Sequence, residues 1–138
     1  LADSTDHRYH YARWDGTVWQ DHEIVPGGKW FPRTPPGHRE REIHYSGGVV
    51  LDHEDPDVVY LSRPVNGVFE IERRETMDLG FTWKSQWITN QSKYDNVRPF
   101  VPWFTPEGAK PHVLWMNNYR YVHYSDYQTD IRMDIPIL

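Results

Sequence analysis

Residues 76–83 read TMDLGFTW, and this octapeptide decides the fold of the chain. Its order is Ser or Thr, any residue, Asp, any residue, Gly, any residue, Thr, aromatic, which is typical of the turn of a β-hairpin. The Asp78 carboxylate accepts backbone N–H bonds within its own turn, and Gly80 adopts the positive φ that a side chain would resist. Trp83, at the start of the next strand, folds back between adjacent sheets. The motif is a folding device, so it indicates architecture first and function second.

The composition favours strands and turns over helices. The 138 residues are the length of one ordinary domain, and 15% of them are aromatic, with 7 Trp and 9 Tyr. The chain also has 11 Pro and 9 Gly, which supply turns. Aromatic residues are enriched in strands, and Pro and Gly bound them, so we expect short strands joined by frequent turns.

Charge and hydropathy exclude some classes of partner. The net charge of -5, with no basic stripe, argues against a nucleic-acid partner, although a local Arg cluster can still bind a polyanionic glycan. No apolar run is long enough to span a bilayer, so we expect no membrane partner. The lack of Cys excludes disulfides and thiolate metal sites and says little about the compartment. The chain begins Leu1-Ala2-Asp3 with no Met and no leader pattern, which we interpret as a processed or truncated beginning.

Turn residues divide the chain into short strands with no helical period. The first two strands form a hairpin around Asp15-Gly16, and a loop rich in Gly, Pro and charge follows it to about residue 43. The next four strands follow in meander order, joined by Asp-Pro and Asn-Gly turns and by the octapeptide. The predicted strands are residues 7–14, 18–24, 47–53, 58–63, 67–75, 82–88, 96–102, 112–116 and 119–124, with a weaker one at 129–133.

Four antiparallel strands in meander order are the unit of a β-propeller blade. We expect an all-β chain with the end of one blade and a loop at about residues 1–43, a complete blade at 44–95 and most of a third at 96–138. About two and a half blades do not close a ring, and the open edges are ones that proteins normally avoid. The chain is therefore interpreted as one partial propeller domain, completed by a separate chain or by a second copy. The alternative is an independent sandwich or small barrel of about ten strands.

Longer segments of the sequence resemble a known family. They are residues 44–53 (HYSGGVVLDH), 55–63, 66–71, 11–16 (YARWDG) and 96–99 (NVRP). With the octapeptide, which matches the Asp-box, they resemble the BNR-repeat (bacterial neuraminidase repeat, sialidase-like) β-propeller proteins. The narrower resemblance is to ulvan lyases, rhamnose–glucuronate lyases and a related rhamnosidase family. Members are seven-bladed and about three times as long, so the chain departs from the pattern by lacking most of the ring.

The resemblance implies β-elimination on uronic-acid-containing glycans. A base removes the C5 proton, the C4–O bond breaks, and an acid protonates the leaving oxygen while a cation neutralises the adjacent carboxylate. Arg suits the neutralising role because its planar fork matches a carboxylate. A Tyr or His serves as base or acid when a nearby cation tunes its pKa. The resemblance implies a Tyr and an Arg from neighbouring strands of one blade, with a His from an earlier blade.

The candidate catalytic residues are Tyr45, Arg63 and His44. Tyr45 lies at the entrance to the first strand of the complete blade, and Arg63 ends the antiparallel second strand. His44 adjoins Tyr45, so both reach one ligand only if the backbone turns, which the following glycine pair allows. The alternatives are a Tyr45 that caps a loop while its ring packs, an exposed Arg63, and a hydrogen-bonded loop His44.

The candidate substrate-binding residues are Arg98, Asn96 and Trp30. Arg98 sits at the corresponding strand start of the next blade and is a second candidate for the sugar carboxylate, with Asn96 close by. Trp30 belongs to a group of loop aromatics that can stack on a sugar ring, the others being Phe31, Trp103 and Phe104. The alternative is burial between blades, the usual fate of a propeller Trp.

The implied chemistry requires no cofactor. The 8 His residues invite a metal hypothesis, but none has a tight ligand spacing such as His-x-x-x-His on a helix. The acidic loop at residues 52–57 (DHEDPD) is either a calcium site or a solvated turn. A structural or charge-neutralising calcium or zinc ion therefore stays open.

The favoured hypothesis is a secreted or periplasmic, carbohydrate-active propeller. Its most specific form is a polysaccharide lyase whose partner is a uronate-containing polysaccharide or oligosaccharide. The alternatives are a rhamnosidase-like glycoside hydrolase on related glycans and a noncatalytic glycan-binding propeller module. A C4–C5 double bond in the product distinguishes the lyase from the hydrolase. Binding that survives Tyr45→Phe without any turnover indicates the noncatalytic module.

Overall fold

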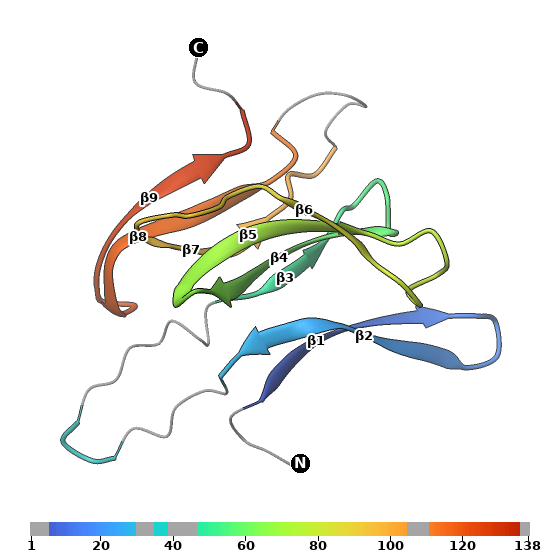
Figure 1. The fold of residues 1–138 in the computed structure, drawn as a ribbon, viewed down its shortest axis with the longest axis horizontal. Coiled ribbons are helices and arrows are strands. Elements are labelled where there is room, and N and C mark those ends of the chain that lie inside the picture. The colour runs from blue at the N-terminus through green and yellow to red at the C-terminus, as the bar shows by residue number, and fades with distance from the viewer. Residues whose placement is uncertain (1–5, 30–34, 39–46, 105–110, 136–138) are drawn as a thin grey trace.

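The computed structural model describes residues 6–29, 35–38, 47–104 and 111–135. Within these ranges the chain forms antiparallel strands and no helix (Figure 1). The strands are β1 (His7–Trp14), β2 (Trp19–Gly28), β3 (Val49–Leu51), β4 (Val58–Val65), β5 (Val68–Glu75), β6 (Lys84–Trp87), β7 (Asp95–Phe100), β8 (Leu114–His123) and β9 (Asp126–Met133). Among these residues, no helix has the length and hydropathy of a membrane span.

The strands form three sheets that follow one another along the chain. β1 and β2 pair with each other, β3 to β6 form a four-stranded meander, and β7 to β9 form a three-stranded one. The four-stranded sheet lies between the other two, as Figure 1 shows. The prediction of an all-β chain built from antiparallel meanders is therefore confirmed.

The prediction of two strands at residues 112–116 and 119–124 is wrong, because β8 (Leu114–His123) is one continuous strand. Its register with β9 shifts between Asn118 and Arg120, so Tyr119 has no Cα partner there. A bulge of this kind inserts a residue and breaks the alternation of side chains. The interrupted pattern therefore mimics a strand end in the sequence. β9 likewise begins at Asp126, before the predicted start at residue 129.

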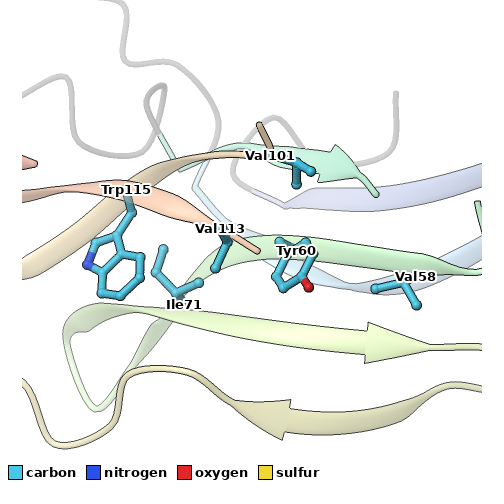
Figure 2. Close-up of a cluster of buried hydrophobic side chains, with 6 residues drawn as sticks. All are labelled: Val58, Tyr60, Ile71, Val101, Val113 and Trp115. Atoms are coloured by element: carbon cyan, nitrogen blue, oxygen red, sulfur yellow. The ribbon is translucent and has the colours of Figure 1, made fainter. Parts of the chain in front are cut away.

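Two clusters of buried side chains hold the sheets together, one on each face of β4. One cluster joins the four-stranded sheet to β1 and β2 and contains Tyr9, Tyr11, Ile24, Val59 and Leu61. The other joins it to the three-stranded sheet, as Figure 2 shows, and contains Val58, Tyr60, Ile71, Val101, Val113 and Trp115. Successive residues of β4 point to opposite faces, and both faces are covered. The run from Val58 to Leu61 is therefore continuously apolar rather than alternating.

The octapeptide forms the hydrogen bonds that its sequence predicts. One Asp78 carboxylate oxygen accepts the Thr82 backbone N–H at 2.8 Å, and the other accepts the Thr82 hydroxyl at 2.6 Å. The Thr76 hydroxyl oxygen accepts the Gly80 N–H at 2.7 Å. The donation by the Thr82 hydroxyl holds the pKa of the Asp78 carboxyl below its usual range. The turn is thus closed by its own side chains.

This turn also fastens the four-stranded sheet to β1. Trp83 Nε1 donates to the Gly80 carbonyl at 3.1 Å, and the Trp83 ring meets Tyr11 edge-to-face with centroids 5.3 Å apart. Gly80 has a φ of +104°, and a Cβ at this position would lie 2.8 Å from Tyr11 Cδ1. The site therefore requires glycine for its backbone conformation and for the close approach of Tyr11.

We expect Gly80→Ala to lower the free energy of unfolding by about 2–4 kcal/mol, because strain at positive φ adds to overlap with Tyr11. Urea denaturation measures the loss. Gly67→Ala is the matched control, since Gly67 also has a positive φ of +87° but no atom within 4 Å of an added Cβ. The control should lose only about 1 kcal/mol. Equal losses at the two positions would contradict a packing role for Gly80.

Tyr9 gives the fold a dependence on alkaline pH. The Tyr9 hydroxyl donates to the Ser62 carbonyl at 2.7 Å, and burial raises the pKa of Tyr9 from 10.0 to about 12. The unfolded chain therefore loses this proton at lower pH than the folded one. The stability that depends on the protonated phenol is complete below pH 10.0 and is lost as the pH rises to about 12.

Urea unfolding midpoints measured across this alkaline range should fall less steeply in Tyr9→Phe than in the unchanged protein. At neutral pH the variant should lose about 1 kcal/mol, the worth of the hydrogen bond to Ser62. Burial also raises the pKa of Tyr60, so part of the alkaline decline should remain in the variant. Identical alkaline slopes in the two proteins would show that Tyr9 does not carry this dependence.

Candidate functional site

Three of the six predicted site residues lie in the described part of the chain: Arg63, Asn96 and Arg98. Tyr45, His44 and Trp30 lie outside the described residues, so their roles stay predictions. The three described residues come from β4 and β7 and have very different surroundings.

The first strands of the two larger meanders, β3 and β7, run in the same direction. The backbone N–H of Arg98 donates to the Gly47 carbonyl at 2.8 Å, just before β3 begins. Beyond the other end of β3, the His53 ring stacks on Trp103, which follows β7. Since Gly47 precedes His53 and Arg98 precedes Trp103, the two chain segments are parallel neighbours.

Arg98 has a strained backbone. Its φ is +55°, although it is not glycine and it precedes Pro99, a position where the backbone is normally extended. It lies where the register of β7 with β8 shifts between Val97 and Phe100. Irregularities of this kind redirect a side chain and occur next to active sites, and such backbone strain costs about 1–3 kcal/mol. The sequence alone gives no sign of this conformation.

The Arg98 side chain is held at the surface by a buried tyrosine. One terminal N–H group of Arg98 donates to the Tyr121 hydroxyl at 3.3 Å, and the guanidinium carbon lies 5.8 Å from the Tyr121 ring centroid. Arg98 is exposed, whereas Tyr121 is only 2% exposed. A buried, rigid ring thus supports an exposed guanidinium, which is a suitable receptor for a carboxylate.

Tyr121 was not predicted as part of the site. Tyr119 and Tyr121 are two residues apart, so a regular strand would place both on the same face. In the structure Tyr119 is 37% exposed and Tyr121 is buried, because the bulge in β8 lies between Asn118 and Arg120. The bulge carries no recognisable residue signal, so the sequence cannot separate these two tyrosines.

Arg63 is bound within the protein to a buried carboxylate. Its Nε donates to Glu72 at 2.8 Å, and its guanidinium carbon lies 4.9 Å from the Trp87 ring centroid. The side chain of Arg63 is 23% exposed and that of Glu72 only 1%. Arg74 also donates to Glu72, at 3.2 Å. Arg63 therefore balances a buried charge in the fold.

Asn96 is an internal cross-link between strands. It is 1% exposed, and its side-chain oxygen accepts Trp115 Nε1 and Asn117 Nδ2, both at 2.9 Å. Its amide nitrogen donates to the Phe69 carbonyl at 3.3 Å and to the Glu70 carboxylate at 3.3 Å. This network connects β5, β7 and β8. It fixes the start of β7, two residues before Arg98. Because Asn96 is buried, we do not include it in the proposed binding surface.

Glu70 is a second buried carboxylate that the sequence did not reveal. It is 2% exposed and accepts the Ser92 backbone N–H at 2.6 Å and the Ser92 hydroxyl at 2.8 Å. The Thr89 hydroxyl donates to it as well. Ser92 and Thr89 belong to the segment between β6 and β7, so this carboxylate anchors the connection between two sheets. In the sequence, Glu70 sits among charged residues that resemble an exposed strand face.

The acidic loop at residues 52–57 is a turn closed by its own carboxylates. Asp52 accepts the backbone N–H groups of Glu54 and Asp55 at 3.0 and 3.3 Å, and Asp57 forms an ion pair with Arg13 at 2.9 Å. Across the described ranges, no group of three or more His, Asp or Glu side chains is arranged to hold a metal ion. These contacts fit the solvated-turn interpretation of the loop.

An open hollow of about 120 Å³ lies between the β1–β2 hairpin and the β3–β4 pair. Its lining is mostly apolar and consists of His10, Tyr11, Ala12, Ile24, Val49, Val50, Leu51 and Val59. Pockets for organic ligands usually measure about 300–1,000 Å³. The hollow is too small for an oligosaccharide and does not include Arg98.

Comparison of the chain with protein-family models, with curated proteins and with solved structures finds no match. The resemblance to the BNR-repeat propellers therefore stays a prediction from sequence.

We expect Arg98→Gly to be more stable than Arg98→Ala by about 1 kcal/mol, because glycine tolerates the left-handed backbone and alanine does not. Both variants lack the guanidinium, so the difference isolates the backbone strain. Urea denaturation measures both. The matched control is the same pair at Gln86, an exposed residue in β6, where alanine should be the more stable. A preference for alanine at position 98 as well would contradict the strain.

Proposed function

We propose that this chain is part of a sialidase-like β-propeller that cleaves uronate-containing glycans as a polysaccharide lyase. The observation that carries the proposal is Arg98, an exposed guanidinium on a strained backbone, supported by Tyr121 and bonded to the start of β3. Strained, non-glycine residues cluster at functional sites. An arginine fixed in this way is a suitable anchor for the carboxylate of a uronic acid.

The stacking of the sheets supports a propeller. A complete four-stranded meander packs between two partial ones, and the turn at residues 76–83 contacts the preceding sheet through Trp83 and Tyr11. β3 and β7 are the first strands of successive meanders and run parallel. In a propeller, blades surround a central channel, and the first strands lie closest to it. Arg98 would then face the channel, where substrates bind.

The proposed elimination uses Arg98 to stabilise the charge that develops on the substrate. A base removes the C5 proton, and the electron pair left on C5 forms the C4–C5 double bond as the C4–O bond breaks. An acid protonates the departing oxygen. Negative charge on the uronate carboxylate grows in the transition state, so two N–H groups of Arg98 bind it more tightly there than in the ground state. No cofactor takes part.

Tyr45 is the proposed acid and base, with His44 beside it. In the sequence, Tyr45 lies two residues before Gly47. The Gly47 carbonyl oxygen accepts the backbone N–H of Arg98. A neighbouring guanidinium favours the phenolate form and so makes a Tyr a better base. Because Arg63 is bound to Glu72, we assign carboxylate binding to Arg98 and a structural role to Arg63.

The proposal includes a partner for the outer edge of β9. Within the described residues, β9 pairs with β8 only, and its exposed side chains include Tyr127, Ile131 and Met133. A complete blade has a fourth strand at this position. The rest of the ring or a second copy would supply it, and would cover the apolar side chains.

A lyase should raise the near-ultraviolet absorbance of a panel of uronate-containing polysaccharides, because elimination creates a C4–C5 double bond conjugated to the carboxylate. Arg98→Ala should lower kcat/KM by about a hundredfold, and Arg98→Lys by about tenfold, since lysine keeps the charge but loses the fork. Tyr45→Phe should abolish the reaction. Arg120→Ala is the matched control, because Arg120 is an exposed arginine paired with Asp126, and it should leave the rate unchanged.

Light scattering on the protein sample used in the absorbance assay measures its molar mass. It therefore shows whether the rate belongs to the single chain or to an assembly. New reducing ends without a rise in absorbance would indicate the rhamnosidase-like hydrolase instead. Binding without turnover would indicate a noncatalytic glycan-binding module. Full activity in Arg98→Ala would exclude Arg98 as the receptor for the carboxylate.

A further inference from the structure

Three aromatic rings lie together in the loops beyond β3 and β7. The rings of His53 and Trp103 stack with centroids 4.2 Å apart and planes 23° apart, and Phe104 lies 6.1 Å from Trp103. Trp103 is 64% exposed and Phe104 is 84% exposed. We call His53, Trp103 and Phe104 the aromatic platform. His53 comes from the turn between β3 and β4, so the platform joins two neighbouring meanders.

The geometry holds these rings out to solvent. Phe104 has a φ of +58°, and a bulky residue in the left-handed region is a conformational outlier. His53 covers one side of Trp103, and the large exposed fraction of Trp103 leaves the rest of its ring open. Exposed aromatic groups of this kind mark binding sites more often than single exposed side chains do.

The charges around the platform select its ligand. His53 lies within the acidic loop, between Asp52 and Glu54, and Glu54 and Asp55 are exposed. An anionic sugar is repelled there, whereas carboxylate oxygens accept hydrogen bonds from sugar hydroxyls. The face of an aromatic ring carries partial negative charge and attracts the C–H groups of a pyranose ring. The combination suits an uncharged sugar.

We propose that the aromatic platform is a binding subsite for an uncharged pyranose unit of a glycan, separate from Arg98. This inference rests on the proposed function, in which Arg98 holds a uronate of the same glycan. Arg98 and Trp103 are five residues apart in sequence, so their backbones are no more than roughly 18 Å apart. One oligosaccharide is long enough to reach both, with its charged unit at Arg98 and a neutral unit at the platform.

The test is a binding experiment on the full chain with neutral and uronate-containing oligosaccharides: xylohexaose, cellohexaose and hexagalacturonate. The indole N–H resonance of Trp103, assigned with Trp103→Phe, should shift with at least one neutral hexasaccharide. Trp103→Ala should weaken that binding roughly three- to tenfold, the worth of one aromatic contact. Trp19→Ala is the matched control, because Trp19 is 66% exposed, lies in β2 and is not part of the aromatic platform. It should leave binding unchanged.

Arg98→Ala separates this inference from the proposed function. It should leave neutral binding at Trp103 intact while it lowers kcat/KM for the uronate-containing polysaccharides by about a hundredfold. If no neutral hexasaccharide shifts the Trp103 resonance, or if Trp103→Ala binds as well as Trp19→Ala, the platform is not a sugar subsite, whatever the lyase assay shows. In the Arg98→Ala variant, hexagalacturonate should shift the Trp103 resonance less than the neutral hexasaccharides do. Equal shifts would contradict the proposed preference of the platform for an uncharged unit. A shift by neutral sugars without any elimination would support the platform and overturn the lyase.

Discussion

The burial of both faces of β4 is the constraint on which the rest of the structure depends. Val58 to Ser62 are all at most 2% exposed, although a strand in an isolated sheet would show one face to water. Burial on both sides requires a sheet on each side, and the two clusters of apolar side chains supply them. The stacking of three sheets, and the side-by-side placement of β3 and β7 that follows, are consequences of this one strand.

Stacked sheets bring two carboxylates into the interior, Glu70 and Glu72, and the chain satisfies each of them in a different way. Glu72 is neutralised by Arg63 and Arg74, whereas Glu70 is held by hydroxyl and N–H donors of the segment that leads to β7. Removing one partner of such a buried group is costly, since the group stays desolvated. The Glu70 contacts therefore help to fix the connection between the four-stranded and three-stranded sheets, whereas the Glu72 contacts join β4 to β5 within one sheet. They also explain why Arg63, which resembles a functional arginine in the sequence, has its charge balanced inside the fold.

The sequence predicted what depends on local patterns and missed what depends on tertiary contacts. The octapeptide and the turn residues correctly indicated the meander of β3 to β6, because the Asp78 and Gly80 roles are local. The bulge in β8 was missed, since any residue can occupy it and only the pairing with β9 reveals it. Glu70 looked exposed because the segment that covers it lies about twenty residues further along the chain. The strain at Arg98 is likewise a product of the hydrogen bond to Gly47 and of the irregular pairing with β8.

The backbone strain at Arg98 must be offset by stabilising contacts elsewhere in the fold, and its neighbours in the chain make such contacts. Asn96 is fully buried and its side chain is bonded to both β5 and β8, so the start of β7 cannot move to relax Arg98. Val97 is fully buried as well, beside Phe69. On the other side, Val101 belongs to the cluster with Tyr60 and Trp115. The core thus holds the segment from Asn96 to Val101 near both ends. The outlying backbone conformation of Arg98 between them costs about 1–3 kcal/mol, and the burial of the flanking residues offsets this cost. Such an arrangement keeps the guanidinium in place before any ligand arrives, so binding a carboxylate would require little further ordering of the protein.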